Sequence, residues 1–143
     1  MRFNGEWLYC DDGIVRPVIS GQIPASDGVW QEIQFLVDTG ADRTVISAEA
    51  FELLKLPYRV PIDRIGGIGG LADSVTIAAA LQLRRDDGKW VTFRGEFAAC
   101  TSYEILDMSV LGRDILNLFA IIVHRDANVV TIIGQGHTYT IHG

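Results

Sequence analysis

The sequence has few basic residues for its length of 143. Lysine and arginine together number 12, against 18 aspartates and glutamates, which gives a formal net charge of −6. Only Arg84 and Arg85 are adjacent, and the other basic residues are scattered along the chain. A protein that binds nucleic acid needs clustered Lys and Arg side chains to neutralise phosphates. We therefore expect no nucleic-acid partner.

Cysteine and histidine are also scarce. The two cysteines, Cys10 and Cys100, form no Cys-x-x-Cys motif, and the three histidines, at positions 124, 137 and 142, are isolated. Metal sites need such residues at short, regular spacings. We expect two reduced thiols, as is usual in a cytosolic protein, and neither a metal ion nor another cofactor.

Long apolar runs are absent. No segment approaches the roughly 20 apolar residues of a membrane-spanning helix, so we expect no membrane partner. The first residues, MRFNGEWLYCDDG, lack the apolar core of a secretory signal. These features favour a cytoplasmic protein. A chain excised from a longer precursor is the alternative.

The residues that are abundant indicate β-structure in one domain, residues 1–143, with a hydrophobic core. The chain is 48% hydrophobic and has 15 glycines. Period-two alternation predicts strands over 16–23, 31–37, 44–47, 73–85, 89–99 and 109–112, and two or three more over 120–143. Helical spacing predicts a short helix over 48–56, closed by Pro57, and another over 113–119. The fold class is therefore mostly β with one or two small helices.

An apolar strand leads into an unusual turn at FLVDTGADRTVIS, residues 35–47. Asp38 follows apolar residues, and so we expect its carboxylate at a buried strand end, where a lone charge is costly. Thr39 can hydrogen-bond nearby backbone, and Gly40 permits a close backbone approach and an unusual φ. One explanation is an Asx-turn, in which Asp38 caps its own turn. The other is a carboxylate held rigidly to face a second charge or a proton.

Three segments, in this order, resemble the retropepsin-like aspartic proteases, the family of the retroviral proteases, and suggest a bacterial or cellular single-domain member. FLVDTGADRTVI resembles their active-site loop, IGGIGG (65–70) their glycine-rich flap tip, and VLGRDIL (110–116) their Gly-Arg-Asp/Asn segment. The resemblance covers about Arg16 to Ile122. It implies a closed β-barrel-like acid-protease fold with one short C-terminal helix and one lobe per chain. After Phe119 the chain departs from retroviral enzymes and resembles cellular and bacterial members, which end in a hairpin.

The resemblance also assigns roles to individual residues. Asp42 would form an ion pair with Arg113 that supports the site. Arg43 stands where retroviral enzymes often carry an acidic residue, and an arginine there favours acidic substrate side chains. The residues assigned are catalytic Asp38, Thr39 and Gly40; substrate-binding Gly40, Asp42, Arg43, Gly67, Ile68 and Gly69; and supporting Arg113 and Asp114.

A single Asp-Thr-Gly motif implies a homodimer. Catalysis in this family needs two carboxylates that share one proton, because like charges at such short range cannot both ionise. A two-fold axis would bring Asp38 of two chains together. The pair would activate a water for hydrolysis of an extended peptide or unfolded protein held under the flaps.

Two other functions are compatible with parts of the sequence. GIGGLA (67–72) matches a dinucleotide-binding loop, but the following SVTIAAAL alternates like a strand and does not open a helix. A catalytically silent retropepsin-fold domain that dimerises or binds peptides is the stronger alternative, because fold does not fix function.

Overall fold

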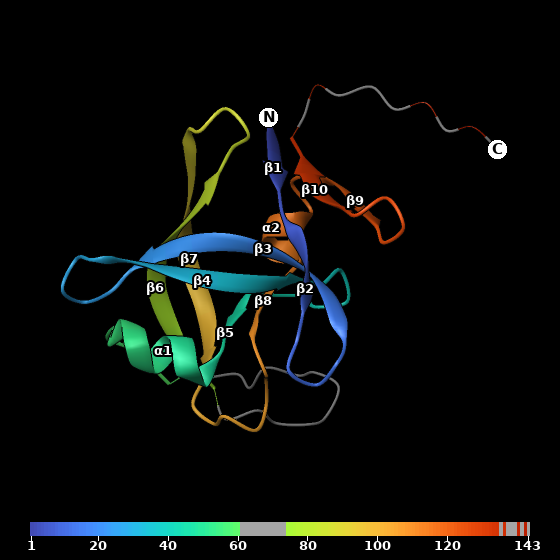
Figure 1. Ribbon diagram of the computed structural model, residues 1–143. Helices are drawn as coiled ribbons and strands as arrows, with labels where there is room; N and C mark the ends of the chain where they lie inside the picture. The colour runs from blue at the N-terminus through green and yellow to red at the C-terminus, as the bar shows by residue number, and fades with distance from the viewer. Residues whose placement is uncertain (61–73, 135, 137–139, 141, 143) are drawn as a thin grey trace.

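The computed structural model describes residues 1–60, 74–134, 136, 140 and 142, so the predicted flap segment 65–70 lies outside the described residues. Figure 1 shows the order and placement of the elements. They are β1 (Arg2–Asn4), β2 (Glu6–Tyr9), β3 (Val15–Pro24), β4 (Trp30–Val37), β5 (Val45–Ile46), α1 (Ala48–Leu54), β6 (Ser74–Arg84), β7 (Trp90–Cys100), β8 (Ser109–Leu111), α2 (Arg113–Leu116), β9 (Ala120–His124) and β10 (Val129–Ile133).

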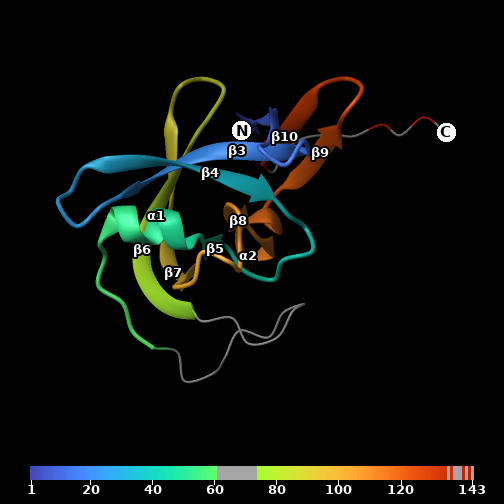
Figure 2. The ribbon, with the colours of Figure 1, turned by 60° about the horizontal axis from the view of Figure 1, so that its bottom comes forward.

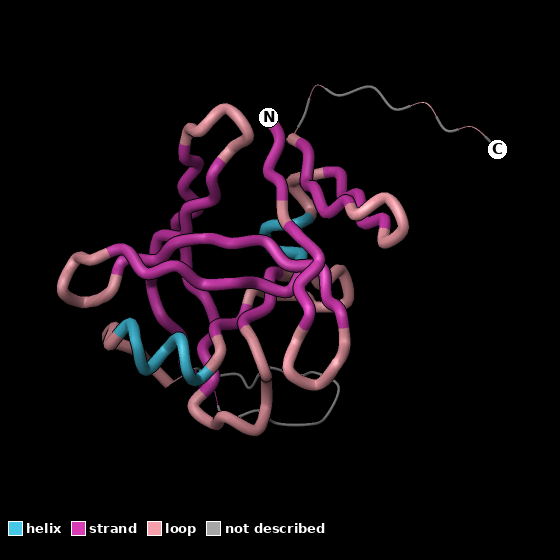
Figure 3. The backbone as a smooth tube through the Cα atoms, viewed as in Figure 1, coloured by secondary structure: helices cyan, strands magenta, loops and turns pink. Residues whose placement is uncertain are grey.

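A closed β-barrel forms the body of the protein. Its sheet has the order β2-β3-β4-β8-β5-β7-β6, and an additional pairing of β3 with β6 closes the ring (Figure 3). Alternate residues of the strands point inward, as expected, and Val75, Ile77, Leu81 and Leu83 of β6 are buried. The predicted mostly-β, barrel-like fold is confirmed.

A smaller sheet of order β1-β10-β9 packs beside the barrel. The sequence did not predict β1 or β2, because each is short and has little apolar alternation. Phe3 of β1 is nevertheless fully buried and meets the ring of Phe119 edge to face, with 5.5 Å between ring centroids. Phe93 of the barrel contacts the same Phe119 ring at 6.0 Å, so this phenylalanine joins the small sheet to the barrel.

Both predicted helices are present, and both are short. Helix α1 lies outside the barrel (Figure 2), begins after the N-cap Ser47 and ends at Leu54, followed by the C-cap Lys55 with a left-handed φ of 52°. Helix α2 covers the first four residues of the predicted 113–119 segment. No helix in the described part of the chain has the length and apolarity needed to span a membrane.

The strand order at β8 determines where the Asp-Thr-Gly turn lies. Strand β8 runs parallel to β4 on one side, with Val37 opposite Leu111, and antiparallel to β5 on the other. The connection between β4 and β5, residues 38–44, must therefore cross the C-terminal end of β8. There it meets residues 112–114, which open α2.

Candidate active site

Asp38 lies where β4 ends. Its backbone N–H donates to the carbonyl of Leu111 at 3.2 Å, which continues the parallel pairing of β4 with β8 by one residue. Val37 is buried, whereas Asp38 is half-buried. The strand end is buried as expected, but the carboxylate reaches solvent, where its charge costs little.

The Asp38 turn is an Asx-turn. Oδ1 of Asp38 accepts a hydrogen bond of 2.9 Å from the Gly40 N–H, and the Asp38 carbonyl accepts one of 3.3 Å from Ala41. Oδ2 has no hydrogen-bond donor among the described residues. The turn therefore orients the carboxylate with one oxygen and leaves the other available.

Gly40 leaves little space for a side chain and does not have a positive φ. The expectation of an unusual φ was wrong, because Gly40 is not among the residues with positive φ. A Cβ added at Gly40 would lie 3.2 Å from Oδ1 of Asp38, tighter than most real Cβ contacts. A side chain here would press on the oxygen that closes the turn.

A buried threonine joins the turn to α2. Thr44, at the end of the loop, is fully buried. Its hydroxyl donates to Oδ1 of Asp114 at 2.7 Å, and its backbone N–H donates to the same oxygen at 3.0 Å. The hydroxyl oxygen also accepts a hydrogen bond of 3.1 Å from the N–H of Gly112. Asp114 therefore holds Thr44 at the end of the loop.

Gly112 lies directly against the backbone of the loop. A Cβ added there would come within 2.3 Å of the carbonyl carbon and oxygen of Arg43 and within 2.8 Å of the Thr44 nitrogen. The φ of Gly112 is −100°, which any residue can adopt. The glycine is therefore required because the two backbones cross in contact.

The predicted ion pair between Arg113 and Asp42 is present. Arg113 Nη2 donates to Oδ1 of Asp42, and the Arg113 backbone N–H donates to the carbonyl of Ala41 at 2.9 Å. Both charged side chains are exposed, 47% for Arg113 and 75% for Asp42. This ion pair attaches the loop to α2 on its solvent-exposed side, and Thr44 attaches the loop to α2 on its buried side.

Arg43 and Thr39 are both exposed. No ion pair or hydrogen bond of the Arg43 side chain is found among the described residues. The guanidinium of Arg43 is therefore available to a ligand, on the same loop as Asp38. Its neighbours in the sequence are not, because Asp42 pairs with Arg113 and Thr44 bonds to Asp114. The assigned flap residues Gly67, Ile68 and Gly69 lie outside the described residues.

Thr44 and the pair Ser47–Ser109 are not evident as supporting residues from the sequence alone. Ser109, at the start of β8, is buried and accepts a hydrogen bond of 2.9 Å from the N–H of Ser47, which follows β5. The available signal was a polar residue at each end of the apolar pair Val45–Ile46. Their partners are more than 60 residues away, so the local pattern does not identify them.

A groove lies away from the Asp38 turn, between α1, the solvent face of β4 and residues 107–109. Its volume is about 740 Å³, and none of the assigned site residues lines it. The residues that line it include Glu32, Gln34, Glu49, Leu53 and Met108. The groove is therefore separate from the candidate active site.

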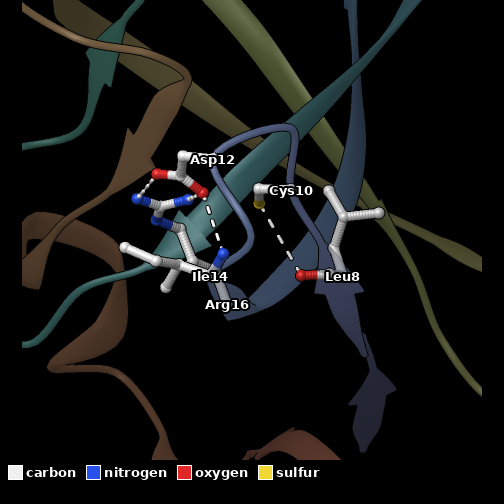
Figure 4. Close-up of polar contacts among 5 residues, drawn as sticks. All are labelled: Leu8, Cys10, Asp12, Ile14 and Arg16. Atoms are coloured by element: carbon white, nitrogen blue, oxygen red, sulfur yellow. Dashed lines mark hydrogen bonds and ion pairs between the residues drawn. The ribbon is translucent and has the colours of Figure 1, made fainter.

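The turn between β2 and β3 contains a second ion pair (Figure 4). The two terminal guanidinium nitrogens of Arg16 donate to the Asp12 carboxylate, at 3.0 and 2.6 Å, and the Ile14 N–H donates to Asp12 Oδ1 at 3.0 Å. The Arg16 hydrogen bonds, followed by the Ile14 bond, lower the pKa of Asp12 from its ordinary 3.8 to about 2. The same pairing raises the pKa of Arg16.

The two cysteines are free, as expected, and differ in burial. Cys100, at the end of β7, is buried, and this burial raises the pKa of its thiol. Cys10 is half-buried in the β2–β3 turn, and its thiol contacts the carbonyl of Leu8 at 3.6 Å (Figure 4).

Comparison with solved structures identifies the same architecture in known proteases. A retropepsin-like aspartic protease from Rickettsia conorii has 19% sequence identity, a TM-score of 0.54, and an alignment that covers 92% of this chain and 90% of that one. The EIAV protease complexed with the inhibitor HBY-793 has 24% identity and a TM-score of 0.51, with 71% and 86% covered. At these identities the likeness shows the fold, which confirms the predicted retropepsin fold.

Comparison with family models shows the family as well as the fold. The model of the retroviral aspartyl protease family matches residues 11–124, which include the Asp38 turn and the whole of α2. No significant match was found among curated proteins. Because the family model spans most of the sequence, the chain belongs to the retroviral aspartyl protease family.

Proposed function

We propose that this protein is an aspartic endopeptidase that acts as a homodimer. The proposal rests on the hydrogen bonding of the Asp38 carboxylate. One oxygen of its carboxylate is fixed by the Gly40 N–H, and the other has no donor among the described residues. A purely structural Asx-turn needs only the first oxygen.

The surroundings of Asp38 suit a catalytic carboxylate. The loop is attached to the end of β8 and to α2 through the Leu111 carbonyl, Thr44 and Arg113. Rigid support of this kind holds a reacting group in one geometry and lowers the entropic part of the barrier. The half-exposed position of Asp38 leaves room for substrate and for a second carboxylate.

The mechanism requires a second copy of the chain. Two Asp38 carboxylates on a two-fold axis share one proton, because two adjacent negative charges repel strongly. The ionised carboxylate takes a proton from a water molecule as that water attacks the scissile carbonyl carbon. The protonated carboxylate donates its proton to the carbonyl oxygen, which gives a tetrahedral intermediate. The C–N bond then breaks, and the leaving amine nitrogen takes up the proton that the other carboxylate removed from the water. Thr39 exchanges hydrogen bonds across the axis beneath the dyad.

An extended peptide is the substrate class that this arrangement accepts. The peptide lies between the loop of residues 38–44 and the flap, with Gly40 and Asp42 toward its main chain. Arg43 is an available cation at the edge of the loop and favours acidic side chains of the substrate. Gly67, Ile68 and Gly69 are proposed to close over the peptide from the other side.

Cleavage of a denatured generic protein tests the proposal. Wild type and Asp38→Asn are compared from pH 4 to 8 at several protein concentrations. We expect the wild type to cut, Asp38→Asn to be inactive, and the specific activity of the wild type to rise with concentration. The substitution keeps the size of the side chain and the oxygen that accepts from Gly40. The turn therefore stays folded while the charge is lost.

The opposite result supports the silent-domain alternative. If neither protein cuts at any pH or concentration, Asp38 is structural and the chain is a retropepsin-fold dimerisation or peptide-binding domain. If Asp38→Asn cuts as fast as the wild type, the activity comes from elsewhere and the aspartic mechanism is wrong.

A further inference from the structure

Strand β4 is paired along almost the whole of one edge and only partly along the other. On one side, β3 pairs with β4 from Trp30 to Leu36. On the other side, β8 pairs with residues 35–37, and no strand in the described part of the chain pairs there with residues 30–34. The first half of β4 is therefore an open sheet edge.

The backbone groups of Glu32 face this open edge. The Ala25 N–H donates to the Val29 carbonyl at 2.9 Å in the β3–β4 turn, and pairs that exchange hydrogen bonds recur at every second residue from there. Residues at odd positions of β4 therefore bond to β3, and the N–H and carbonyl of Glu32 point away from it. Asp38, also at an even position, fits this alternation, because its N–H donates to Leu111 beyond the end of β8 pairing.

The open edge forms one wall of the groove between α1 and β4. Its volume is about 740 Å³, and Glu32 and Gln34 line it from β4. The groove continues into a second hollow of about 620 Å³ that reaches the β2–β3 turn, since Gln34 and Met108 line both parts. Figure 1 shows α1, the loop that precedes β8 and the β2–β3 turn in this order below β4. The shape therefore suits an elongated ligand.

The groove is acidic. No lysine, arginine or histidine lines either part of it, and Asp12 in the second part is neutralised by Arg16. Four further carboxylates line the groove and form no ion pair with a described residue: Glu32, Glu49, Glu52 and Asp107. Carboxylates gathered in a concave surface without cations attract a positively charged ligand.

Apolar and aromatic side chains are exposed along the same groove. Leu53 of α1 is 53% exposed, and Tyr9 and Tyr103 in the second part are 74% and 59% exposed. Such side chains contact the aliphatic stems of lysine and arginine, and a tyrosine ring attracts the cation at the end of the stem. A bare metal ion fits less well, because the described residues contain no group of three or more side chains placed to hold one.

We propose that this groove binds an extended polypeptide segment with lysine or arginine at every second position. The segment adds a strand to the open edge of β4, where its backbone bonds to the N–H and carbonyl of Glu32. Side chains two residues apart lie on the same face of a strand, so the cations all lie on the face that carries the Glu32 side chain. Opposite charges on neighbouring strands attract. The proposal does not rest on the proposed cleavage, because none of the assigned site residues lines the groove.

Fluorescence anisotropy of a labelled peptide, Lys-Val-Lys-Thr-Lys-Val, tests the proposal. The protein carries Asp38→Asn, so that the probe is not cut. We expect saturable binding that weakens as the NaCl concentration rises, because salt screens exposed charges. The peptide Glu-Val-Glu-Thr-Glu-Val should bind much more weakly. Equal affinity for the two peptides, or no binding of the lysine peptide, overturns the proposal.

A matched pair of double variants tests the place of binding. Glu32→Gln with Glu49→Gln removes two exposed carboxylates from the groove, and we expect the Kd of the lysine peptide to rise about threefold to tenfold. The control is Glu6→Gln with Asp126→Asn, which removes two exposed carboxylates that do not line the groove and should leave the Kd unchanged. Circular dichroism shows whether each variant is folded. If the groove variant binds as tightly as its parent, the peptide binds elsewhere and the proposal is wrong.

Two N-methylated forms of the lysine peptide test the added strand. One carries N-methyl groups on its lysines, and the other carries them on its valines and threonine. Backbone N–H groups of successive residues point to opposite edges of a strand, so only one of these sets faces β4. We expect one methylated peptide to lose binding and the other to keep it. If both bind like the unmodified peptide, or neither binds, the segment does not pair with β4.

Failure of this proposal is distinguishable from failure of the proposed function. The binding measurements involve no cleavage, and the cleavage test of Asp38 involves no residue of the groove. A protein that binds the lysine peptide through Glu32 and Glu49 but cleaves nothing supports the groove and contradicts the enzyme. A protein whose cleavage depends on Asp38 but which does not bind the peptide overturns the groove alone.

Discussion

The hydroxyl of Thr44 donates to the carboxylate of Asp114 at 2.7 Å, across 70 residues of sequence. The same hydroxyl accepts from the Gly112 N–H, so this buried group links the end of the Asp38 loop to the start of α2. The loop has no secondary structure of its own between β4 and β5. Its conformation therefore depends on this connection and on the outer ion pair of Arg113 with Asp42.

Removing the Thr44 hydroxyl should destabilise the protein and disturb the Asp38 loop. Thr44→Val keeps the shape of the side chain but leaves the Gly112 N–H without a partner and takes a donor from Asp114. Buried hydrogen bonds to charged groups contribute about 1.5–3 kcal/mol, and we expect a loss of about that size. Urea unfolding measures it, and proteolytic activity should fall with it.

Thr44→Ser is the matched control. It keeps the hydroxyl and removes one methyl group from a buried position, which costs roughly 1 kcal/mol. If this variant loses as much activity as Thr44→Val, packing of the methyl group and not the hydrogen bonds maintains the loop.

A methyl group at Gly112 should be tolerated poorly. Gly112→Ala would place Cβ within 2.3 Å of the Arg43 carbonyl, and the crossing backbones would have to separate. We expect a loss of about 1–3 kcal/mol in unfolding free energy, as for other overpacked sites. Gly95→Ala in β7 is the control, since its Cβ would meet nothing within 4 Å. Equal stability of the two variants would show that the loop can move away freely.

The exposed pair of Asp42 and Arg113 should matter for activity more than for stability. Surface ion pairs contribute about 0.2–1 kcal/mol, because water and salt screen them. A double-mutant cycle of Asp42→Ala and Arg113→Ala should give a coupling energy in that range by urea unfolding. The same variants should lower kcat/KM clearly, since the pair positions the loop that carries Asp38. If the coupling energy from urea unfolding is large and kcat/KM is unchanged, the ion pair supports stability and not activity, and this prediction is wrong.

The sequence predicted the parts of the fold that depend on neighbouring residues, such as the inward face of β6, which its alternation identified. The Asp42–Arg113 ion pair joins residues 71 apart, and it was predicted from the resemblance to retropepsin-like proteases and not from local sequence.

What the sequence did not predict depends on contacts between distant segments. Strands β1 and β2 are too short to show a pattern and form because β10 and β3 offer them an edge. Thr44 reads as an ordinary strand residue until Asp114 is placed beside it. Gly40 was expected to provide an unusual φ, yet it provides space beside a carboxylate oxygen. The φ of a glycine follows from the closed turn, which local sequence does not specify.

The Asp12–Arg16 pair gives a prediction for acidic pH. The pKa of Asp12 in the folded protein, about 2, is below its ordinary 3.8. The carboxylate form is thus favoured by folding, and the pair contributes fully above pH 3.8. The contribution is lost as the pH falls from 3.8 through 2 and the carboxyl takes up its proton. A carboxyl NMR titration of the folded protein should show Asp12 titrating near pH 2.

Arg16 is the main cause of this shift, so replacing it should largely restore an ordinary titration. In Arg16→Gln we expect the pKa of Asp12 to rise toward 3.8 and to stop short of it, because the Ile14 N–H still donates to the carboxylate. Arg16→Lys keeps the charge but loses the two-pronged contact, and should give an intermediate pKa. If Asp12 titrates near 3.8 in the wild type, the ion pair does not persist in solution. The β2–β3 turn then depends on its backbone hydrogen bonds between Cys10, Gly13 and Ile14 alone.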